Sequence, residues 1–192
     1  MVSAVNFAKN KKVFYIDTEG GFSVERLRQI TKESDKIMKN IYIFKPTTFE
    51  EQAKVISKIS SIISKDVGII IVDTISFLYR LELGDKDAHN TNRALGRQIA
   101  LLAQIARKRQ IPVLITNQVY SDFDNREKVK IVGGDLLKYG SKCIVELQKT
   151  PDNKRRAVVR KHRSLPEEKS IVFEIVEEGI KKSKEGKSFR IF

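Results

Sequence analysis

The stretch Val67 to Arg80, V-G-I-I-I-V-D-T-I-S-F-L-Y-R, decides the fold. Its run from Gly68 to Val72 is almost wholly apolar and β-branched, with no alternation between apolar and polar residues. That pattern is typical of a strand buried on both faces, as in a parallel sheet covered by helices. The run ends abruptly at Asp73 and Thr74, which predicts a carboxylate at the strand end where ligands bind in open α/β sheets. The alternative is a strand that merely stops at an Asp capping the next helix.

Three other segments share this strand character, and each is followed by polar or turn-forming residues. They are Val13 to Ile16 before Asp17-Thr18-Glu19-Gly20-Gly21, Ile41 to Phe44 before Pro46, and Pro112 to Thr116 before Asn117-Gln118. The glycine pair at 20–21 predicts a flexible turn with a left-handed residue. Apolar residues recur at helical spacing between these strands. Alternating strands and helices predict an α/β fold with a mostly parallel sheet.

Helix boundaries follow from capping residues and apolar spacing. Ser23 is expected to cap one helix that carries Leu27, Ile30 and Ile37 on its inner face. The pairing of Thr47 and Thr48 with Glu50 and Glu51 is a capping-box pattern and predicts a second helix. Residues 91–109 form a long amphipathic pattern, whereas 81–92 and 121–130 are polar and are predicted to be loops.

The C-terminal part of the sequence has a different pattern. After Gly133-Gly134, residues 142–148, 155–161 and 171–176 alternate like strands, and 150–153 is expected to join the first two as a hairpin. We therefore expect antiparallel strands that extend the parallel sheet. Without a repeat or a low-complexity linker, residues 1–192 are predicted to be a single domain.

Composition limits the functional classes. The net charge is +13 and the pI about 9.8, which favours a polyanionic partner, above all nucleic acid. The alternative is a solvated Lys- and Glu-rich surface, as some thermophile proteins have. No apolar run approaches the ~20 residues that cross a bilayer. The lone Cys143 excludes an internal disulfide framework and a cysteine zinc site, and is expected to be a small core residue in a cytoplasmic protein.

Three side chains follow buried strands directly and are expected to meet at one edge of the sheet: Glu19, Asp73 and Gln118. Parallel strands place their carboxyl ends together. One acid to hold Mg²⁺, a second to orient a water and an amide near the terminal phosphate would suit nucleotide hydrolysis. Polar residues often end strands, so each one alone is a weak signal.

These segments also resemble a known family. The segment V-F-Y-I-D-T-E-G-G-F-S-V-E-R-L (13–27), the Walker B-like I-I-I-V-D-T-I-S-F-L-Y-R and L-I-T-N-Q-V (114–119) occur in register. Together they resemble the RecA/RadA recombinase superfamily, and within it the archaeal recombinase paralogues. The short loop after Gln118 and the run K-H-R-S-L-P (161–166) support that branch. The resemblance implies a RecA-like P-loop NTPase core, with a mostly parallel sheet flanked by helices and C-terminal antiparallel strands.

The resemblance also implies residue roles. Glu19 matches the water-activating glutamate, and Gln118 the glutamine that couples nucleotide state to DNA binding. Asp73 matches the Walker B aspartate that holds Mg²⁺ indirectly, with Thr74 beside it, and Arg26 matches the arginine that stacks on adenine. Lys161 and Arg163 resemble a pair that reaches a neighbour's ATP site in related hexamers; the alternative is a solvated basic strand end.

The sequence departs from this family at the phosphate-binding loop. The motif G-x-x-x-x-G-K-[ST] is expected before Val13 and is not found there. The sequence starts within the helix that usually follows that loop. We therefore expect either a truncated product or gene model, or a paralogue with very weak or no ATPase activity, since the backbone cradle and its lysine hold the phosphates.

DNA contact has two candidate places. Arg126, Lys128 and Lys130 lie in the loop after Gln118, and a basic hairpin tip is formed by Lys154, Arg155 and Arg156. Such cations bind phosphates without reading sequence. The short loop lacks aromatic residues for stacking, so strand exchange is not expected.

Three hypotheses follow. The first is a DNA-binding accessory or regulator of homologous recombination and repair, associated with the nucleoid. The second is an active DNA-dependent ATPase of RecA or KaiC type whose P-loop is missing from this sequence alone. The third is a non-enzymatic partner of a recombinase or nuclease; homo-oligomerisation is compatible with all three.

Overall fold

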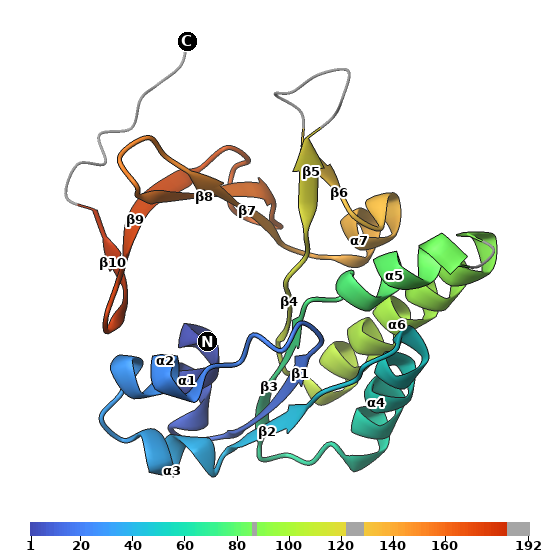
Figure 1. Ribbon diagram of the computed structural model, residues 1–192, viewed down its shortest axis with the longest axis horizontal. Helices are drawn as coiled ribbons and strands as arrows, with labels where there is room; N and C mark the ends of the chain where they lie inside the picture. Colours follow the sequence, from blue (N-terminus) through green and yellow to red (C-terminus); the bar gives the residue numbers. More distant parts are fainter. Residues whose placement is uncertain (86–87, 122–128, 184–192) are drawn as a thin grey trace.

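A computed structural model describes residues 1–85, 88–121 and 129–183. A parallel sheet with helices on both faces occupies the lower part of Figure 1, and a curved antiparallel sheet of C-terminal strands lies above it. The carboxyl ends of the parallel strands point toward this second sheet, so the edge between the two is where the sequence predicts chemistry.

The parallel sheet has the strand order β2-β1-β3-β4. Its members are β1 (Lys12–Asp17), β2 (Ile41–Phe44), β3 (Val67–Asp73) and β4 (Val113–Ile115), and all neighbours pair in parallel. In β3, every residue from Val67 to Val72 is buried, which confirms the expectation from the unbroken apolar run. The α/β prediction is therefore confirmed.

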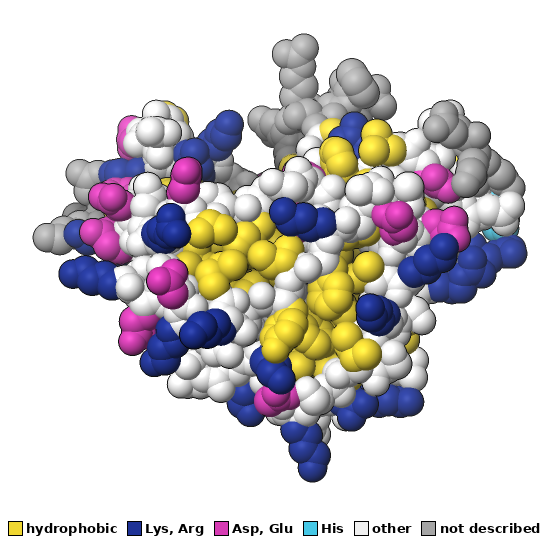
Figure 2. Space-filling model, turned by 60° about the horizontal axis from the view of Figure 1, so that its bottom comes forward, with side chains coloured by type: hydrophobic (Ala, Val, Ile, Leu, Met, Phe, Trp, Pro, Cys, Tyr) yellow, Lys and Arg dark blue, Asp and Glu magenta, His cyan; other side chains and the backbone are white. Residues whose placement is uncertain are grey.

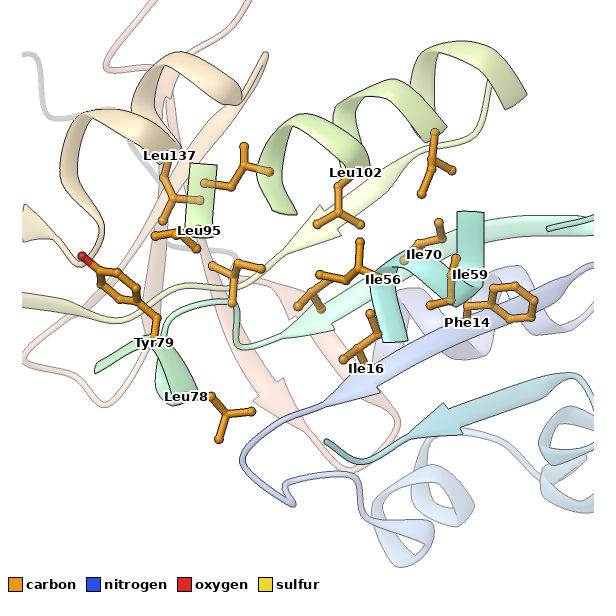
Figure 3. Close-up of a cluster of buried hydrophobic side chains, with 14 of the residues drawn as sticks. Phe14, Ile16, Ile56, Ile59, Ile70, Leu78, Tyr79, Leu95, Leu102 and Leu137 are labelled. Carbon is orange, nitrogen blue, oxygen red and sulfur yellow. The ribbon is translucent and has the colours of Figure 1, made fainter. Parts of the chain in front are cut away.

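Helices cover both faces of this sheet because alternate side chains of each strand point to opposite sides. On one side, Tyr15 and Ile71 pack with α1 (Val2–Ala8), α2 (Val24–Ile30) and α3 (Ser34–Met38). On the other, Ile16 and Ile70 pack with α4 (Phe49–Ile62), α5 (Phe77–Asp85) and α6 (Ala88–Arg109). Figure 3 shows this second cluster, in which α4 and α6 lie over β1 and β3. This packing positions the carboxyl ends of the strands.

Two helix predictions need correction. The helix capped by Ser23 is two helices: α2 ends at Ile30, and α3 begins at Ser34. Helix α2 buries Leu27 completely and α3 buries Ile37 completely. The apolar spacing therefore identified the inward-facing residues correctly, although the helix breaks between them. The predicted loop 81–92 belongs largely to α5 and α6. Its polar character comes in part from His89, Asn90 and Asn92, which are exposed on the outer face of a helix that packs inward elsewhere.

The capping prediction for α4 is confirmed. The Thr48 hydroxyl accepts the backbone N–H of Glu51 at 3.1 Å. The Glu51 carboxylate accepts the N–H and the hydroxyl of Thr47, both at 2.8 Å. These hydrogen bonds lower the pKa of Glu51 because they favour its charged form.

The C-terminal strands form sheets of their own. A two-stranded sheet of β5 (Val119–Ser121) and β6 (Val129–Ile131) precedes α7 (Gly134–Gly140). The antiparallel sheet has the order β10-β9-β8-β7. Its strands are β7 (Ile144–Lys149), β8 (Arg155–Lys161), β9 (Ser170–Val176) and β10 (Gly179–Lys182). The predicted strands are present, but among the described residues none pairs with the parallel sheet, and β10 was not predicted.

The alternation in this second sheet leaves one face open. Strand β7 alternates between half-buried and exposed residues along its whole length. Cys143, just before β7, is exposed, so its predicted place in the core was wrong. Alternation of apolar and polar residues identifies a strand, but it does not determine which face of the strand other elements cover.

Candidate functional site

Three strand ends meet at the carboxyl edge of the parallel sheet, as the sequence predicted. Asp17 at the end of β1 pairs in register with Asp73 at the end of β3. The hydroxyl of Thr116, just after β4, donates a hydrogen bond of 2.5 Å to Asp73 Oδ1. The edge is therefore a continuous row of polar groups contributed by β1, β3 and β4.

Glu19, Thr74 and Gln118 form one hydrogen-bonded group at this edge. Glu19 Oε1 accepts both the Thr74 hydroxyl at 3.0 Å and Gln118 Nε2 at 2.8 Å. The other oxygen, Oε2, accepts no hydrogen bond from the described residues, so it can bind a water or a ligand proton. Residues from three loops, distant in sequence, therefore converge on one carboxylate.

Asp73 has both oxygens engaged. Oδ1 accepts from Thr116 and Oδ2 accepts from the hydroxyl of Tyr15. Burial of the phenol and its hydrogen bond to Asp73 raise the pKa of Tyr15, so the hydroxyl remains a donor at neutral pH. The carboxylate is thereby fixed in orientation, and each oxygen has a further lone pair for a metal-bound water. The Asp73–Thr74 peptide bond is cis.

The loop after β1 is held by its own aspartate and by Thr18. Asp17 Oδ1 accepts the N–H of Gly21 at 2.9 Å, and Gly20 has φ +72°, a left-handed conformation that suits glycine. The Thr18 hydroxyl donates to Thr74 O at 2.7 Å and accepts the Thr74 N–H at 2.9 Å. These buried bonds place Glu19 beside Thr74.

Arg80 is a site residue that the sequence analysis missed. Its Nη1 donates a hydrogen bond of 2.7 Å to Gln118 Oε1, while the amide nitrogen of Gln118 bonds Glu19. The guanidinium thereby fixes which way the Gln118 amide points. Arg80 closes the quoted stretch V-G-I-I-I-V-D-T-I-S-F-L-Y-R, one helical turn into α5, and that position was the available signal.

Arg26, the candidate for adenine stacking, contacts the second sheet. Its guanidinium donates to the backbone carbonyls of Val176 (2.7 Å), Glu177 (3.0 Å) and Gly179 (3.3 Å) at the turn between β9 and β10. It also donates to Gln29 at 2.8 Å. Arg26 is thus part of the junction between α2 and the antiparallel sheet, and the structure does not bring it to Glu19 by hydrogen bonding.

The remaining basic candidates lie outside this hydrogen-bonded group. Lys161 Nζ donates to the carbonyl of Lys138 in α7 at 2.7 Å, and Arg163 is exposed in the turn after β8. Arg155 donates to the carbonyls of Asn153 and Lys154 in the hairpin turn, and Arg156 is exposed. Lys130 lies in β6, whereas Arg126 and Lys128 fall outside the described residues.

The residues of this edge could bind Mg²⁺ only together with a nucleotide, whose phosphates and bound waters would supply most of the metal ligands. In the part of the chain that the structure describes, no group of three or more His, Cys, Asp or Glu could hold a metal by itself. A nucleotide Mg²⁺ takes most of its ligands from phosphates and waters, and one carboxylate such as Asp73 fits that pattern. Of the described helices, none has the length and apolar character to cross a bilayer.

Comparison with known proteins gives a consistent result. A family model for Rad51 matches residues 4–183. The DNA repair and recombination protein RadB of Methanobrevibacter smithii is 45% identical over 188 residues, covering 94% of this chain and 80% of that protein. The protein of the same name from Methanococcoides burtonii is 45% identical over 175 residues, covering 90% and 77%. A solved structure described as the crystal structure of the RadB recombinase matches with a TM-score of 0.79 at 33% identity, covering 93% of this chain and 81% of that one.

Proposed function

The chain belongs to the Rad51 family, and on that basis we propose that it is a DNA-binding accessory or regulatory protein of homologous recombination and DNA repair. We propose further that it has very weak or no ATPase activity by itself, does not carry out strand exchange, and acts in the cytoplasm at the nucleoid. The observation that carries the recombination role is the 45% identity to proteins named for DNA repair and recombination, which extends over 94% of the chain.

Sequence-independent DNA binding is supported by charge. The chain has a net charge of +13, and the proposed contacts are cations that bind phosphates rather than base edges. Arg155 and Arg156 begin β8 and Lys154 directly precedes it, at the turn end of the β7–β8 hairpin, which lies away from the helices in Figure 1. The second proposed group of contacts is Arg126, Lys128 and Lys130, of which Lys130 lies in β6 and the other two fall outside the described residues.

The nucleotide proposal rests on the group at the carboxyl edge. Asp73 would hold the water shell of Mg²⁺, and Glu19 Oε2 would orient a water that attacks the terminal phosphate. Gln118 would report the state of that phosphate through its hydrogen bond to Glu19. These 192 residues contain no G-x-x-x-x-G-K-[ST] motif, whose backbone N–H groups and lysine hold the phosphates in P-loop NTPases, so hydrolysis by these residues alone is expected to be very weak or absent.

DNA binding is tested with Lys154, Arg155 and Arg156 all replaced by Gln. For wild-type protein, we expect the logarithm of the association constant for a labelled duplex to fall linearly with log salt concentration. The triple variant should lower that slope by about 1 for each phosphate contact removed. Fluorescence anisotropy between about 50 and 200 mM salt measures it. A wild-type protein that binds no DNA at the lowest salt would overturn the proposed function.

Hydrolysis is tested at Glu19. If Mg-ATP is turned over, Glu19→Gln should lower turnover by at least ~10²-fold and leave nucleotide binding nearly unchanged, since the amide cannot accept a proton. Glu25→Gln, an exposed glutamate in the first turn of α2, is the matched control. Phosphate release measures turnover, and equal rates for wild type and Glu19→Gln would remove Glu19 from the mechanism.

A protein partner is favoured by one further observation. Apolar side chains of the antiparallel sheet share its open face, since cross-strand partners and alternate residues point the same way. Those that are exposed are Val145, Leu147, Ile171, Ile175 and Ile180. We propose that this face contacts a second copy or a recombinase or nuclease partner. Light scattering that shows a monomer at all concentrations, with no complex with a recombinase, would contradict it.

A further inference from the structure

The amino-terminal edge of the parallel sheet, opposite the candidate site, is strongly basic. Helices α1, α3, α4 and α6 end there, and short connections lead into β1, β2, β3 and β4. Asp66 is the only acid in these helix ends and connections (9–12, 39–40, 63–66 and 107–112). We call this region the amino-end surface and define it by its cations: Lys9, Lys11, Lys12, Lys39, Lys65, Arg107, Lys108 and Arg109.

Most of this positive charge is not neutralised within the chain. Lys12 forms an ion pair with Asp66 at 2.6 Å, and Lys11 Nζ donates to the carbonyl of Lys65 at 3.4 Å. The side chains of the other six cations form no hydrogen bond or ion pair with any residue that the structure describes. These six are Lys9, Lys39, Lys65, Arg107, Lys108 and Arg109, and all are exposed. Figure 2, which brings the bottom of Figure 1 forward, shows Lys and Arg side chains spread around the apolar side chains of the lower face.

Helix dipoles account for only part of this charge. A helix C-terminus carries about −0.5 elementary charge, so four of them offset about two cations. Neutral groups bond carbonyls at two of these helix ends: Asn40 Nδ2 donates to Ala8 O at 2.7 Å, and the N–H of Ile63 donates to Ile59 O at 3.0 Å. The cations therefore exceed what the helix ends require.

A hollow in this surface provides a place for an anion. It lies between the ends of α4 and α6, has a volume of about 460 Å³, and opens to solvent. Its lining combines two cations with two polar side chains and two isoleucines: Ser60, Ile63, Gln104, Ile105, Lys108 and Arg109. Hydroxyl, amide and cationic donors around one hollow suit a phosphate group, which accepts several hydrogen bonds at once.

We propose that the amino-end surface is a second binding surface for the sugar–phosphate backbone of nucleic acid. Lysines on flexible stems bind phosphates as point charges, so binding here is independent of base sequence. The surface lies at the opposite end of the parallel strands from the hairpin cations Lys154, Arg155 and Arg156 (Figure 1). One chain can then contact two nucleic-acid segments on opposite sides. This inference goes beyond the proposed function, which places DNA only at the carboxyl side.

The test compares two variants with the same loss of charge. The surface variant replaces Lys9, Lys39, Lys65 and Lys108 with Gln. The control variant replaces four exposed lysines elsewhere, and these also lack a partner among the described residues: Lys32, Lys45, Lys169 and Lys181. Thermal unfolding first establishes that both variants are folded. Anisotropy with a short labelled duplex then gives the salt dependence of binding between about 50 and 200 mM salt.

We expect the surface variant to lower the salt slope by about 2 to 4 and the affinity at the lower salt by at least ~10-fold, with a much smaller change in the control variant. Equal salt slopes in the surface and control variants would overturn the second binding surface. The proposed function would still stand in that case if replacing Lys154, Arg155 and Arg156 with Gln weakens DNA binding. A wild-type protein without any DNA affinity would overturn both. Equal affinity of the wild type for phosphatidylserine vesicles, lost in the surface variant, would assign the surface to membranes instead and overturn the inference.

Discussion

The two four-stranded sheets of this protein use similar β-branched residues under very different burial. In the parallel sheet, Ile70 at the centre of β3 is completely buried, because α4 and α6 cover one face and α1 to α3 the other. In the antiparallel sheet, Ile175 in β9 is 61% exposed and Ile180 in β10 is 59% exposed. The difference shows that a residue's tendency to form a strand does not decide how much that residue stabilises the fold. The parallel sheet forms the core of the molecule because helices cover both of its faces.

The largest expected effect compares one isoleucine from each sheet. Ile70→Ala removes buried methylene and methyl groups and leaves a cavity, so we expect a loss of about 3 kcal/mol in the free energy of unfolding. Ile175→Ala, the matched substitution on the open face, should change it by less than about 0.5 kcal/mol. Urea denaturation measures both. Similar losses in the two variants would mean that the open face is covered in solution, for example in an oligomer.

The next effect concerns the helices that cover the parallel sheet. Gln52 of α4 donates to Gln98 Oε1 of α6 at 2.8 Å and to the carbonyl of Ile75 at 3.3 Å, and both glutamines are buried. Gln52→Leu should cost about 2 kcal/mol because it leaves the Gln98 amide buried without a partner.

Replacing both glutamines with Leu tests that cause. The double variant should recover part of the loss, because no unpaired amide then remains in the core. A double-mutant cycle by urea denaturation measures the coupling between Gln52 and Gln98. Additive losses would show that the two amides do not depend on one another.

A smaller effect is expected where the two sheets are joined. Arg26→Ala removes three hydrogen bonds to carbonyls at the β9–β10 turn, and we expect a loss of about 1 to 2 kcal/mol. Amide hydrogen exchange should quicken in β9 and β10 but not in β3. Arg28→Ala, an exposed arginine on the same helix with no partner among the described residues, is the control and should behave like the wild type. Uniformly faster exchange would indicate global unfolding instead.

The smallest effect lies at the amino end of the parallel sheet and depends on pH. The hydrogen bonds from Lys12 and Ser64 lower the pKa of Asp66 to about 2. The pair therefore stabilises the fold fully above the unfolded pKa of about 3.9, and this stabilisation is lost as the pH falls toward about 2. Lys12→Gln should lower Tm at pH 5 by about 2 °C at most and leave Tm near pH 2 unchanged, because solvent screens this partly exposed ion pair. Lys39→Gln, without an ion pair among the described residues, should show no such pH dependence.

Local patterns predicted the parallel sheet and part of the candidate site. The unbroken apolar run of β3 identified a strand buried on both faces, and the capping pattern at Thr48 identified the start of α4. The convergence of Glu19, Asp73 and Gln118 followed from one rule, that parallel strands place their carboxyl ends together. The RecA-like fold implied by the resemblance is confirmed by the Rad51 match and by the related solved structure.

Other features depended on which distant segments meet. Arg26 contacts carbonyls about 150 positions away in the chain, and Arg80 contacts Gln118, and neither pairing leaves a signal in the local sequence. The exposure of Cys143 was likewise mispredicted, because alternation does not say which face of a sheet is covered.

The sequence by itself determined the strands, most of the helices, the strand ends that carry polar groups, and the excess of positive charge. These depend on apolar periodicity, capping residues and composition, which are properties of neighbouring residues. Only the tertiary structure decided that the C-terminal strands form a separate sheet, that Arg80 orients Gln118, and that unpaired cations gather where the parallel strands begin. Those features arise from contacts between remote segments, whose formation depends on the packing of the whole chain.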